Sequence, residues 1–284
     1  MATLNVLVVG ATGLQGGAAA HALVQAGHSV RAMTRNLAHP AAEALRLRGA
    51  RLAWTDLDDE RRVSEAVAGM DAVVAVAAEV CQGQRLVTVA QRAGVGHFVY
   101  LSLPGAQTVT HAPLLDSRHE IERYLQASHL PFTIVSPGFL MENLLAPPWL
   151  DGLRRGELLL PMPAGRKLPQ VAAADLGRFV RVVVEQRQRF LGRRVDIASD
   201  ALTPIEMAAS LARITGRPLR HVEPADEQFA PASPVAAAVC AWLGEHDTTA
   251  DVGWLRSEFS EVNWHTLDGW AKRQDWAPLD PAPA

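Results

Sequence analysis

The sequence predicts an α/β protein: a doubly wound parallel sheet with helices on both faces, followed by a smaller C-terminal α/β lobe. Three observations support this fold class. Short apolar runs alternate with alanine-rich stretches of helical length through the first half of the chain. A glycine follows each of four such stretches, and a glycine-rich turn joins the first apolar run to the first helical stretch. Alternation of this kind is typical of parallel sheets.

Six apolar runs have the composition of strands that are buried on both faces of a sheet. We expect these strands at 4–9, 29–33, 51–54, 72–76, 97–101 and 132–136. Helices are expected between them at 15–26, 40–48, 61–68 and 85–93. Helices often end at a residue with a left-handed backbone, which glycine adopts without strain. This explains the glycine that follows each of these helices: Gly27, Gly49, Gly69 and Gly94.

The alternation of apolar runs and helical stretches stops after Pro137, where a second region with a different pattern begins. A helix is expected at 174–188, and Thr203 and Glu206 form a capping box for a helix that ends before Gly216. We therefore predict a main domain over 1–145, with 174–200 returning to it, and a smaller lobe over 146–173 and 201–284. Five of the seven tryptophans either line a pocket in this lobe or fill a small core or an interface: Trp242, Trp254, Trp264, Trp270 and Trp276.

Composition excludes several classes of function. The formal net charge of -3 gives no basic excess for nucleic acid. No run of about 18 apolar residues predicts a membrane span, and no secretory signal pattern precedes the first strand. Two cysteines without a C-x-x-C motif suit a reduced, cytoplasmic protein. No spacing of His, Cys and carboxylates predicts a metal site.

The segment Gly10–Gly16 has the spacing G-x-x-G-x-x-G between an apolar strand and a helix. Gly10 permits the tight turn, Gly13 lets the backbone approach a diphosphate, and Gly16 lets the helix pack on the strand. Free N–H groups at the start of a helix favour such an anion. The segment predicts a dinucleotide-binding domain of the Rossmann type; the alternative is a glycine-rich turn without a ligand.

The end of the second strand indicates which dinucleotide binds. Domains that bind NAD usually place an acidic residue there, which bonds the ribose 2′-hydroxyl. Here the strand ends in Thr34-Arg35-Asn36, and Arg35 offers a guanidinium group for a 2′-phosphate. NADPH is favoured over NADH, unless Arg35 is a solvated loop residue. Asp56, after the third strand, either borders the adenine or belongs to a helix cap.

Several segments together resemble the NmrA-like group of atypical short-chain dehydrogenases. They are GATGLQGG (10–17), VRAMTRN (30–36), DLDD (56–59), GVGHFVYLS (94–102), DSRHEIERYL (116–125), PGFLMENLL (137–145) and ADLGRF (174–179). The resemblance covers nearly the whole chain. It implies binding of NADP(H), or less favourably NAD(H), and either reduction of quinones and enones or a non-catalytic role as a redox sensor.

The resemblance also implies positions for the cofactor. Arg35 would hold the 2′-phosphate, Asp56 and Leu57 would lie near the adenine, and Ala77 would line the ribose. The residues near the nicotinamide would be Leu140, Met141, Glu142 and Asn143. The diphosphate would be held by Gly10, Ala11, Thr12, Gly13, Leu14, Gln15 and Gly16.

The sequence departs from the chemistry of ordinary short-chain dehydrogenases. Those enzymes use a Tyr-x-x-x-Lys pair as the proton donor, and neither Lys167 nor Lys272 stands four residues after a tyrosine. Arg118 occupies the family's lysine position, and Ser136 occupies the position of its arginine before P-G-F. Arginine stays protonated, so it is a poor proton donor.

Three residues remain as catalytic candidates. Ser102, at the family's serine position, either orients a carbonyl group or caps the end of the fifth strand. Arg118 either touches the cofactor or substrate, or it is a surface residue paired with Glu122. His111 precedes Arg118 in a loop and is either an acid or an ordinary surface histidine.

Two functions from different classes follow. The first is an NADPH-dependent oxidoreductase that transfers hydride to a small quinone, enone, imine or carbonyl acceptor. Such acceptors need alignment with the nicotinamide more than they need a side-chain acid. The alternative is a non-catalytic NADP(H) sensor that regulates a protein partner. A homodimer is compatible with either function.

Overall fold

The computed structural model describes residues 2–224, 234–247 and 250–279. The chain forms two compact units: Met1–Ser136 with Ala173–Val195, and Pro137–Ala172 with Asp196–Ala284. The division therefore comes at Ser136, earlier than the residue 145 expected from sequence. The reason is that β7 (Phe139–Leu140) pairs with β9 (Leu168–Val171), a strand of the second unit.

The first unit is built on a seven-stranded sheet with the order β10-β6-β5-β4-β1-β2-β3. Neighbouring strands from β3 to β6 are parallel. The predicted doubly wound α/β fold is confirmed, and the six predicted strands match to within one residue at each end. The strands are β1 (Asn5–Val8), β2 (Ser29–Thr34), β3 (Arg51–Trp54), β4 (Ala72–Ala75), β5 (His97–Leu101), β6 (Phe132–Pro137) and β10 (Arg193–Ile197).

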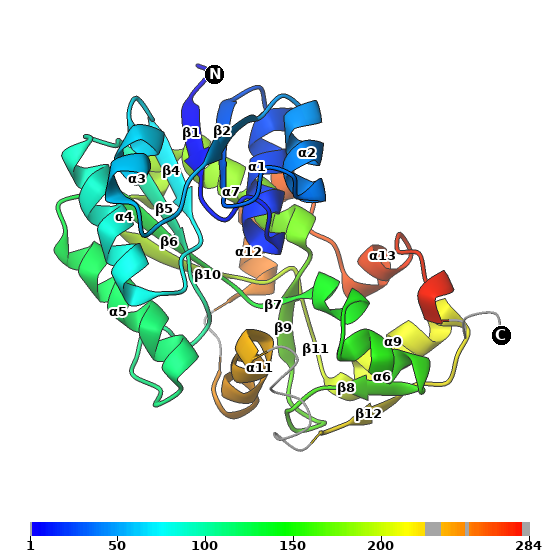
Figure 1. Ribbon diagram of the computed structural model, residues 1–284. Helices are drawn as coiled ribbons and strands as arrows, with labels where there is room; N and C mark the ends of the chain where they lie inside the picture. Colours follow the sequence, from blue (N-terminus) through cyan, green and yellow to red (C-terminus); the bar gives the residue numbers. More distant parts are fainter. Residues whose placement is uncertain (1, 225–233, 248–249, 280–284) are drawn as a thin grey trace. The chain divides into compact units, whose positions relative to one another are not determined.

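Helices cover both faces of this sheet, with α1, α2 and α7 on one side and α3, α4 and α5 on the other (Figure 1). The predicted start of α4 at residue 85 is wrong, because the helix already begins at Val80. The helix expected at 174–188 is two helices, separated at Gln186. The helices are α1 (Leu14–Gln25), α2 (Pro40–Leu47), α3 (Glu60–Val67), α4 (Val80–Arg92), α5 (Pro113–Ala127), α7 (Ala173–Glu185) and α8 (Arg187–Phe190).

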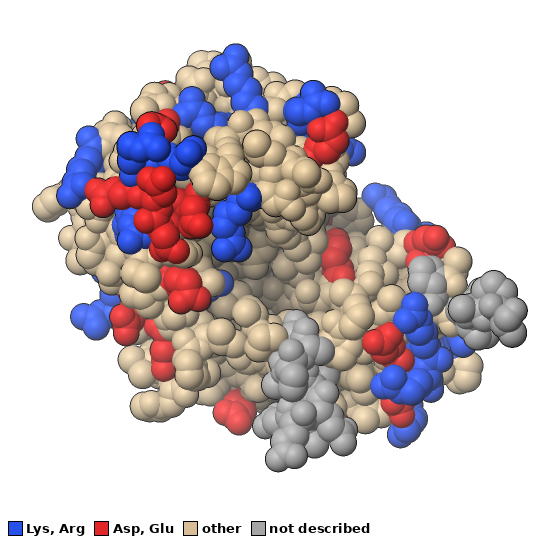
Figure 2. All heavy atoms as spheres, in the orientation of Figure 1, with Lys and Arg blue, Asp and Glu red and all other residues tan. Residues whose placement is uncertain are grey.

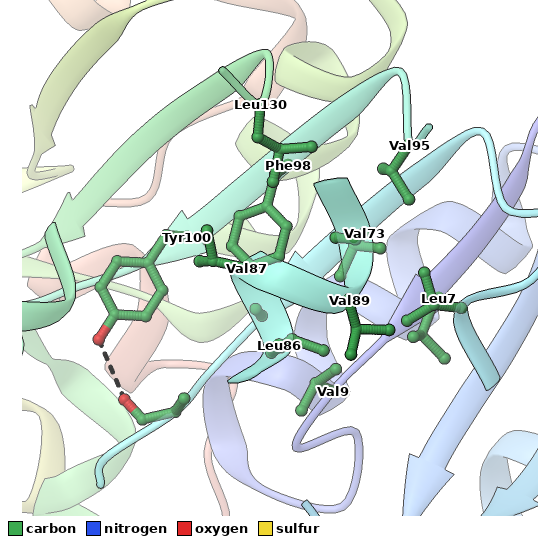
Figure 3. Packing of buried hydrophobic residues seen from close by; sticks show 14 of the residues in the cluster. Leu7, Val9, Val73, Leu86, Val87, Val89, Val95, Phe98, Tyr100 and Leu130 are labelled. Atoms are coloured by element: carbon green, nitrogen blue, oxygen red, sulfur yellow. Dashed lines mark hydrogen bonds between the residues drawn. The ribbon is translucent and has the colours of Figure 1, made fainter. Parts of the chain in front are cut away.

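A cluster of buried apolar side chains holds the sheet against α3, α4 and α5. Leu7, Val73 and Phe98 come from three neighbouring strands, and Leu86 and Val87 come from α4 (Figure 3). Each is at most 1% exposed. Burial of one such side chain contributes about 1.5–3 kcal/mol, so this cluster fixes the strand ends that carry the site.

On the opposite face, α1 and α7 approach each other closely. A Cβ atom on Gly177 would lie 2.3 Å from the carbonyl oxygen of Ala18, a separation that a side chain cannot occupy. The contact between these helices therefore requires glycine in α7. It fixes α1, the helix that follows the glycine-rich segment.

The second unit contains a three-stranded sheet, β11-β9-β7, and a parallel pair, β12-β8. The predicted capping box is confirmed, since Thr203 Oγ1 accepts the Glu206 N–H and Glu206 Oε2 accepts the Thr203 N–H. Gly216 ends that helix with a left-handed backbone (φ 69°). The remaining elements are η1 (Met141–Leu145), α6 (Trp149–Arg154), β8 (Glu157–Leu159), β11 (Asp200–Leu202), α9 (Pro204–Thr215), β12 (Arg220–Val222), α11 (Pro234–Glu245), α12 (Val252–Glu258), η2 (Ser260–Val262), α13 (Leu267–Ala271) and η3 (Ala277–Leu279).

Candidate functional site

A cavity of about 360 Å³ opens in the first unit at the carboxyl ends of four adjacent strands. In sheets of this type, ligands bind at the carboxyl ends of the strands. The lining comes from the ends of β1 to β4 and from the start of α4. It consists of Val9, Gly10, Thr12, Met33, Thr34, Arg35, Thr55, Asp56, Leu57, Val76, Ala77, Ala78, Glu79 and Gln82.

The glycine-rich segment turns from β1 into α1 under two steric constraints. Gly10 has a left-handed backbone (φ 71°), and a Cβ atom there would lie 3.2 Å from the Val76 Cβ atom. A Cβ atom on Gly16 would lie 2.3 Å from the carbonyl oxygen of Gly10. Both glycines are therefore required by the fold of the turn itself.

Gly13 differs from these two glycines. Its backbone is extended (φ -88°), and a Cβ atom there would make only an ordinary contact, 3.4 Å from the carbonyl oxygen of Gly10. Packing within the protein therefore does not require glycine at this place. Gly13 is the N-cap of α1, and no side chain caps the first turn of the helix. The N–H groups of that turn are thus left for an anion.

The other residues of this segment take different positions. Thr12 lines the cavity, Ala11 is fully buried, and Leu14 is exposed. The side-chain oxygen Oε1 of Gln15 is buried and has no hydrogen-bond partner among the residues that the structure describes. Buried polar atoms of this kind are uncommon and call for a specific explanation.

Arg35 lies in the exposed turn after β2 and lines the cavity. Within the described part of the chain, its guanidinium group has no hydrogen bond or ion pair. A cation at the mouth of this cavity is therefore available to an anionic ligand.

The loop after β3 forms the neighbouring wall of the cavity with Asp56 and Leu57. The Asp56 side chain accepts the N–H of Asp58 at 3.0 Å, whereas the N-cap of α3 is Asp59. Arg85 of α4 donates to the carbonyl oxygen of Leu57 at 2.6 Å and pairs with Asp58 at 3.1 Å. This loop is therefore held by α4 rather than only by its own turn.

Ala77, after β4, has its carbonyl oxygen held by a buried tyrosine. The Tyr100 hydroxyl donates to that oxygen at 3.0 Å (Figure 3). Burial raises the pKa of Tyr100, the charge of Arg118 lowers it, and the charge of Glu122 raises it. The phenol therefore stays protonated and keeps the Ala77 backbone in place.

Ser102 and Glu122 form a buried pair beside Tyr100. The Ser102 hydroxyl, which has no exposed surface, donates to Glu122 Oε1. Arg194 of β10 donates to the same carboxylate oxygen at 2.7 Å and to the carbonyl oxygen of Leu103 at 3.0 Å. The carboxylate therefore has both a hydroxyl and a cation as partners, as burial of its charge requires.

Arg118 lies on the buried side of α5, with 7% of its surface exposed. Its Nη1 atom is buried without a hydrogen-bond partner, and no ion pair to it is present in the described parts of the chain. The interpretation of Arg118 as a surface residue paired with Glu122 is wrong, because both side chains are buried. Its charge acts on Tyr100, which places the two side chains in one electrostatic environment.

His111 does not share this environment. It is exposed in the turn before α5 and has a left-handed backbone (φ 60°). It lies close to Asp116, whose pKa is lowered first by the Thr110 backbone N–H and to a lesser degree by His111. The polar contacts of His111 are therefore local to this turn.

Leu140–Asn143 belong to the second unit, where Leu140 ends β7 and Met141 begins η1. Leu140 and Met141 are buried. Glu142 accepts a hydrogen bond from Trp270 Nε1 at 3.0 Å. Trp264 and Trp270 are buried in this unit, Trp254 is exposed, and Trp242 and Trp276 are half-buried. The tryptophans thus divide between core and surface.

Across residues 2–224, 234–247 and 250–279, no group of three or more His, Cys, Asp or Glu side chains is arranged to hold a metal ion. Over the same residues, no helix combines the length and apolar character needed to span a bilayer.

Sequence reasoning missed several residues around the cavity and the buried pair. Thr34, Thr55 and Gln82 line the cavity, and their positions after strands or at the start of α4 are a signal that was available. Glu122 and Arg194 carried no usable signal. They meet Ser102 only because segments distant in sequence come together in the fold: α5 carries Glu122, and β10, which carries Arg194, is separated from β5 by one strand of the sheet.

Comparisons with known proteins identify the family of the chain. The model of the NmrA-like family matches residues 2–270. The NAD(P)H azoreductase of Xenophilus azovorans is 31% identical over 223 residues, which cover 76% of this chain and 76% of that protein.

Two solved structures have the same fold. NmrA, a negative transcriptional regulator in complex with NADP, matches with a TM-score of 0.80, 20% identity and coverage of 96% of this chain and 95% of that one. The NADPH-dependent quinone oxidoreductase of Escherichia coli matches with a TM-score of 0.76, 24% identity and coverage of 94% and 98%. The chain therefore belongs to the NmrA-like family.

Proposed function

We propose that this protein is an NADPH-dependent oxidoreductase that acts on a small quinone, enone, imine or carbonyl acceptor. The observation that carries the proposal is the buried Arg118, whose Nη1 atom has no hydrogen-bond partner among the residues that the structure describes. Buried charges are normally paired, because an unpaired one is costly. Arg118 stands at the position where the family keeps a lysine that faces the nicotinamide ribose, so a bound cofactor would supply the missing partner.

The cavity supports binding of NADP(H) in preference to NAD(H). The uncapped first turn of α1 would hold the diphosphate with Gly10, Thr12 and Gly13. Arg35 would bond the 2′-phosphate through its guanidinium group, which no described residue engages. Asp56 and Leu57 would border the adenine. We also propose that Ala77 contacts the ribose and that Leu140–Asn143 lie near the nicotinamide.

The cofactor, when bound, supplies the hydride; the chain's own residues decide how the acceptor obtains its proton. The hydroxyl of Ser102 donates to Glu122, and that of Tyr100 donates to Ala77. Both protons are therefore engaged within the protein. Acceptors that take a proton from water, such as quinones and conjugated alkenes, suit this arrangement better than unactivated ketones. The azoreductase and the quinone oxidoreductase among the similar proteins support this choice.

The same engaged hydroxyls favour a second candidate, an NADP(H) sensor without catalytic activity. A sensor needs the cavity and Arg35 but no proton donor. The similarity to a negative transcriptional regulator solved with NADP supports this alternative. A sensor would bind the cofactor without turnover and would change its affinity for a protein partner with the NADPH/NADP⁺ ratio.

Steady-state oxidation of NADPH tests the two candidates directly. The purified protein is supplied with NADPH or NADH and a panel of quinones, enones, imines and aldehydes. Turnover with an acceptor, lost in Arg118→Met, would support the oxidoreductase. Tight NADPH binding without turnover across the panel would favour the sensor. Absence of NADPH binding by calorimetry would refute both.

A further inference from the structure

We propose that Trp54 determines specificity for the phosphorylated cofactor by positioning the turn that carries Arg35. This inference rests on the proposed preference for NADPH. Trp54 is the last residue of β3 and lies opposite Thr34 of β2 in the parallel pair. Its indole Nε1–H donates to the backbone carbonyl oxygen of Arg35 at 3.0 Å. The side chain of one strand thus holds the backbone that follows the neighbouring strand.

The turn after β2 has its own local hydrogen bonds, which define its shape. The N–H of Asn36 donates to Thr34 Oγ1 at 3.1 Å, and Asn36 Oδ1 accepts the N–H of Ala38 at 3.0 Å. These bonds join residues within the turn. The bond from Trp54 is of another kind, since it ties the turn to β3. It therefore sets where the backbone of Arg35 lies relative to the cavity.

The indole ring of Trp54 is itself held in place by Arg62 of α3. The Arg62 guanidinium carbon lies 4.3 Å from the centre of the ring, and Arg62 Nε is 3.3 Å from Asp59 Oδ2. Trp54 is 44% exposed, so the cation on the face of its indole restricts a side chain that the protein interior only partly encloses. Contacts thus run from α3 through Arg62 and Trp54 to the backbone of Arg35.

Other arginines on this surface behave differently. Basic and acidic side chains are interspersed over α3 and α4 (Figure 2). Arg61 pairs with Glu65 of the same helix, and Arg92 pairs with Glu60. Such exposed ion pairs contribute little to the free energy of unfolding. Arg61 is therefore a matched control for Arg62, because it lies on the same helix without touching the indole.

The arrangement affects discrimination between cofactors more than general affinity. Moving the turn changes where the Arg35 guanidinium group meets the 2′-phosphate, a group that NADH lacks. Other lining residues, such as Thr12 and Ala77, are carried by other turns and remain in place. Loss of the Trp54 bond should therefore weaken NADPH binding and leave NADH binding unchanged.

Calorimetric titration of the full chain with NADPH and with NADH tests this inference. Trp54→Phe keeps an aromatic ring for Arg62 but removes the N–H donor. We expect its affinity for NADPH to fall about three- to tenfold, the worth of one neutral hydrogen bond, with affinity for NADH unchanged. Arg62→Ala should shift the ratio of the two affinities in the same direction, and Arg61→Ala should not shift it.

Arg35→Ala provides the reference that separates the two proposals. If Trp54 acts through Arg35, adding Trp54→Phe to Arg35→Ala changes the affinity ratio no further. A ratio unaltered by Arg35→Ala would overturn the proposed NADPH preference and this inference with it. A ratio altered by Arg35→Ala but not by Trp54→Phe would overturn this inference alone. Equal loss of both cofactors in Trp54→Phe would also overturn it, since that result indicates damage to the whole cavity.

Discussion

His97 Nε2 lies 2.8 Å from Thr133 Oγ1, inside the first unit, where both side chains are at most 1% exposed. Thr133 Oγ1 donates its own proton to the carbonyl oxygen of Phe190 at 2.9 Å, so it must accept the proton of His97 Nε2–H. His97 Nδ1 has no partner among the described residues. The imidazole is therefore neutral in the folded protein.

This pair predicts a loss of stability in mild acid. Burial, and then the charge of Arg187, lower the pKa of His97 from 6.5 to about 4. The unfolded chain binds the proton more tightly, so this contribution is complete above pH 6.5 and is lost as the pH falls toward 4. The loss amounts to roughly 3 kcal/mol over that range. Urea unfolding between pH 7.5 and 4.5 measures it. His97→Gln keeps an N–H donor for Thr133 and should show a shallower pH dependence; an unchanged slope would contradict the assignment.

The two tyrosines of the chain should differ when each is changed to phenylalanine. Tyr100→Phe leaves the buried carbonyl oxygen of Ala77 without its donor, at a cost of about 1–3 kcal/mol. NADPH affinity should fall as well, because Ala77 lines the cavity. Tyr124→Phe removes an exposed bond to Thr88 and should change stability by less than about 0.5 kcal/mol. Thermal unfolding and NADPH titration compare the two, and equal effects would argue against a role for the Ala77 contact.

Alanine at either of two glycines in one turn should affect different properties: stability at Gly16, and NADPH affinity at Gly13. Gly16→Ala places Cβ against the carbonyl oxygen of Gly10 and should destabilise the fold by about 1–3 kcal/mol. Gly13→Ala meets only ordinary contacts, so its stability cost should stay below about 1 kcal/mol. If Gly13 is open for the diphosphate, the variant should nevertheless bind NADPH about tenfold more weakly. An unchanged NADPH affinity in Gly13→Ala would contradict the proposal that the diphosphate binds beside Gly13.

Replacing Arg118 by methionine should separate stability from function. The substitution removes a buried charge that has no partner within the described ranges of the chain, so the protein without cofactor should become about 1–2 kcal/mol more stable. The stabilisation that added NADPH provides should shrink in the same variant. Unfolding curves with and without NADPH measure both quantities. A less stable Arg118→Met protein would indicate that the guanidinium group is satisfied within the fold.

Truncation of Glu122 should be the most damaging of these changes. Glu122→Ala leaves the half-buried cation of Arg194 without this carboxylate and deprives the buried Ser102 of its acceptor. The expected cost is about 3–5 kcal/mol. Glu120→Ala, at an exposed position of the same helix, should cost less than about 0.5 kcal/mol. Chemical unfolding at pH 7 compares them, and similar midpoints would show that the buried cluster does not support the fold.

Residue periodicity was sufficient to predict six of the first unit's seven strands, because strands buried on both faces read as continuous apolar runs. The seventh, β10, has the sequence RRVDI and is mostly half-buried, so it lacks such a run. Periodicity placed the start of α4 too late because Gly83 interrupts the pattern. The structure gives the reason for that glycine: a Cβ atom there would lie 2.7 Å from the side chain of Ile121, so the residue serves packing between α4 and α5. Such a contact between distant segments leaves no mark in the local sequence.

The candidate site also contains some features that the sequence predicts and others that only the fold reveals. The glycine turn and Arg35 are local features, and the sequence was enough to place them beside one cavity. Arg118 and Glu122 have helical spacing, which suggested an exposed ion pair. Only the fold reveals that Ser102 and Arg194 surround the carboxylate instead. The short strands of the second unit, such as β7 and β11, are too brief for any periodic signal.

The first unit is assembled from two stretches of chain, and α7 with β10 comes from the later one. During synthesis, α1 emerges long before Gly177, the residue that lets α7 lie against it. Until residues 173–195 have left the ribosome, the helix that follows the glycine turn lacks its main neighbour, and the sheet lacks an edge strand. The nascent chain should therefore acquire protease resistance late and in one step, and a fragment ending at residue 136 should not bind a dinucleotide.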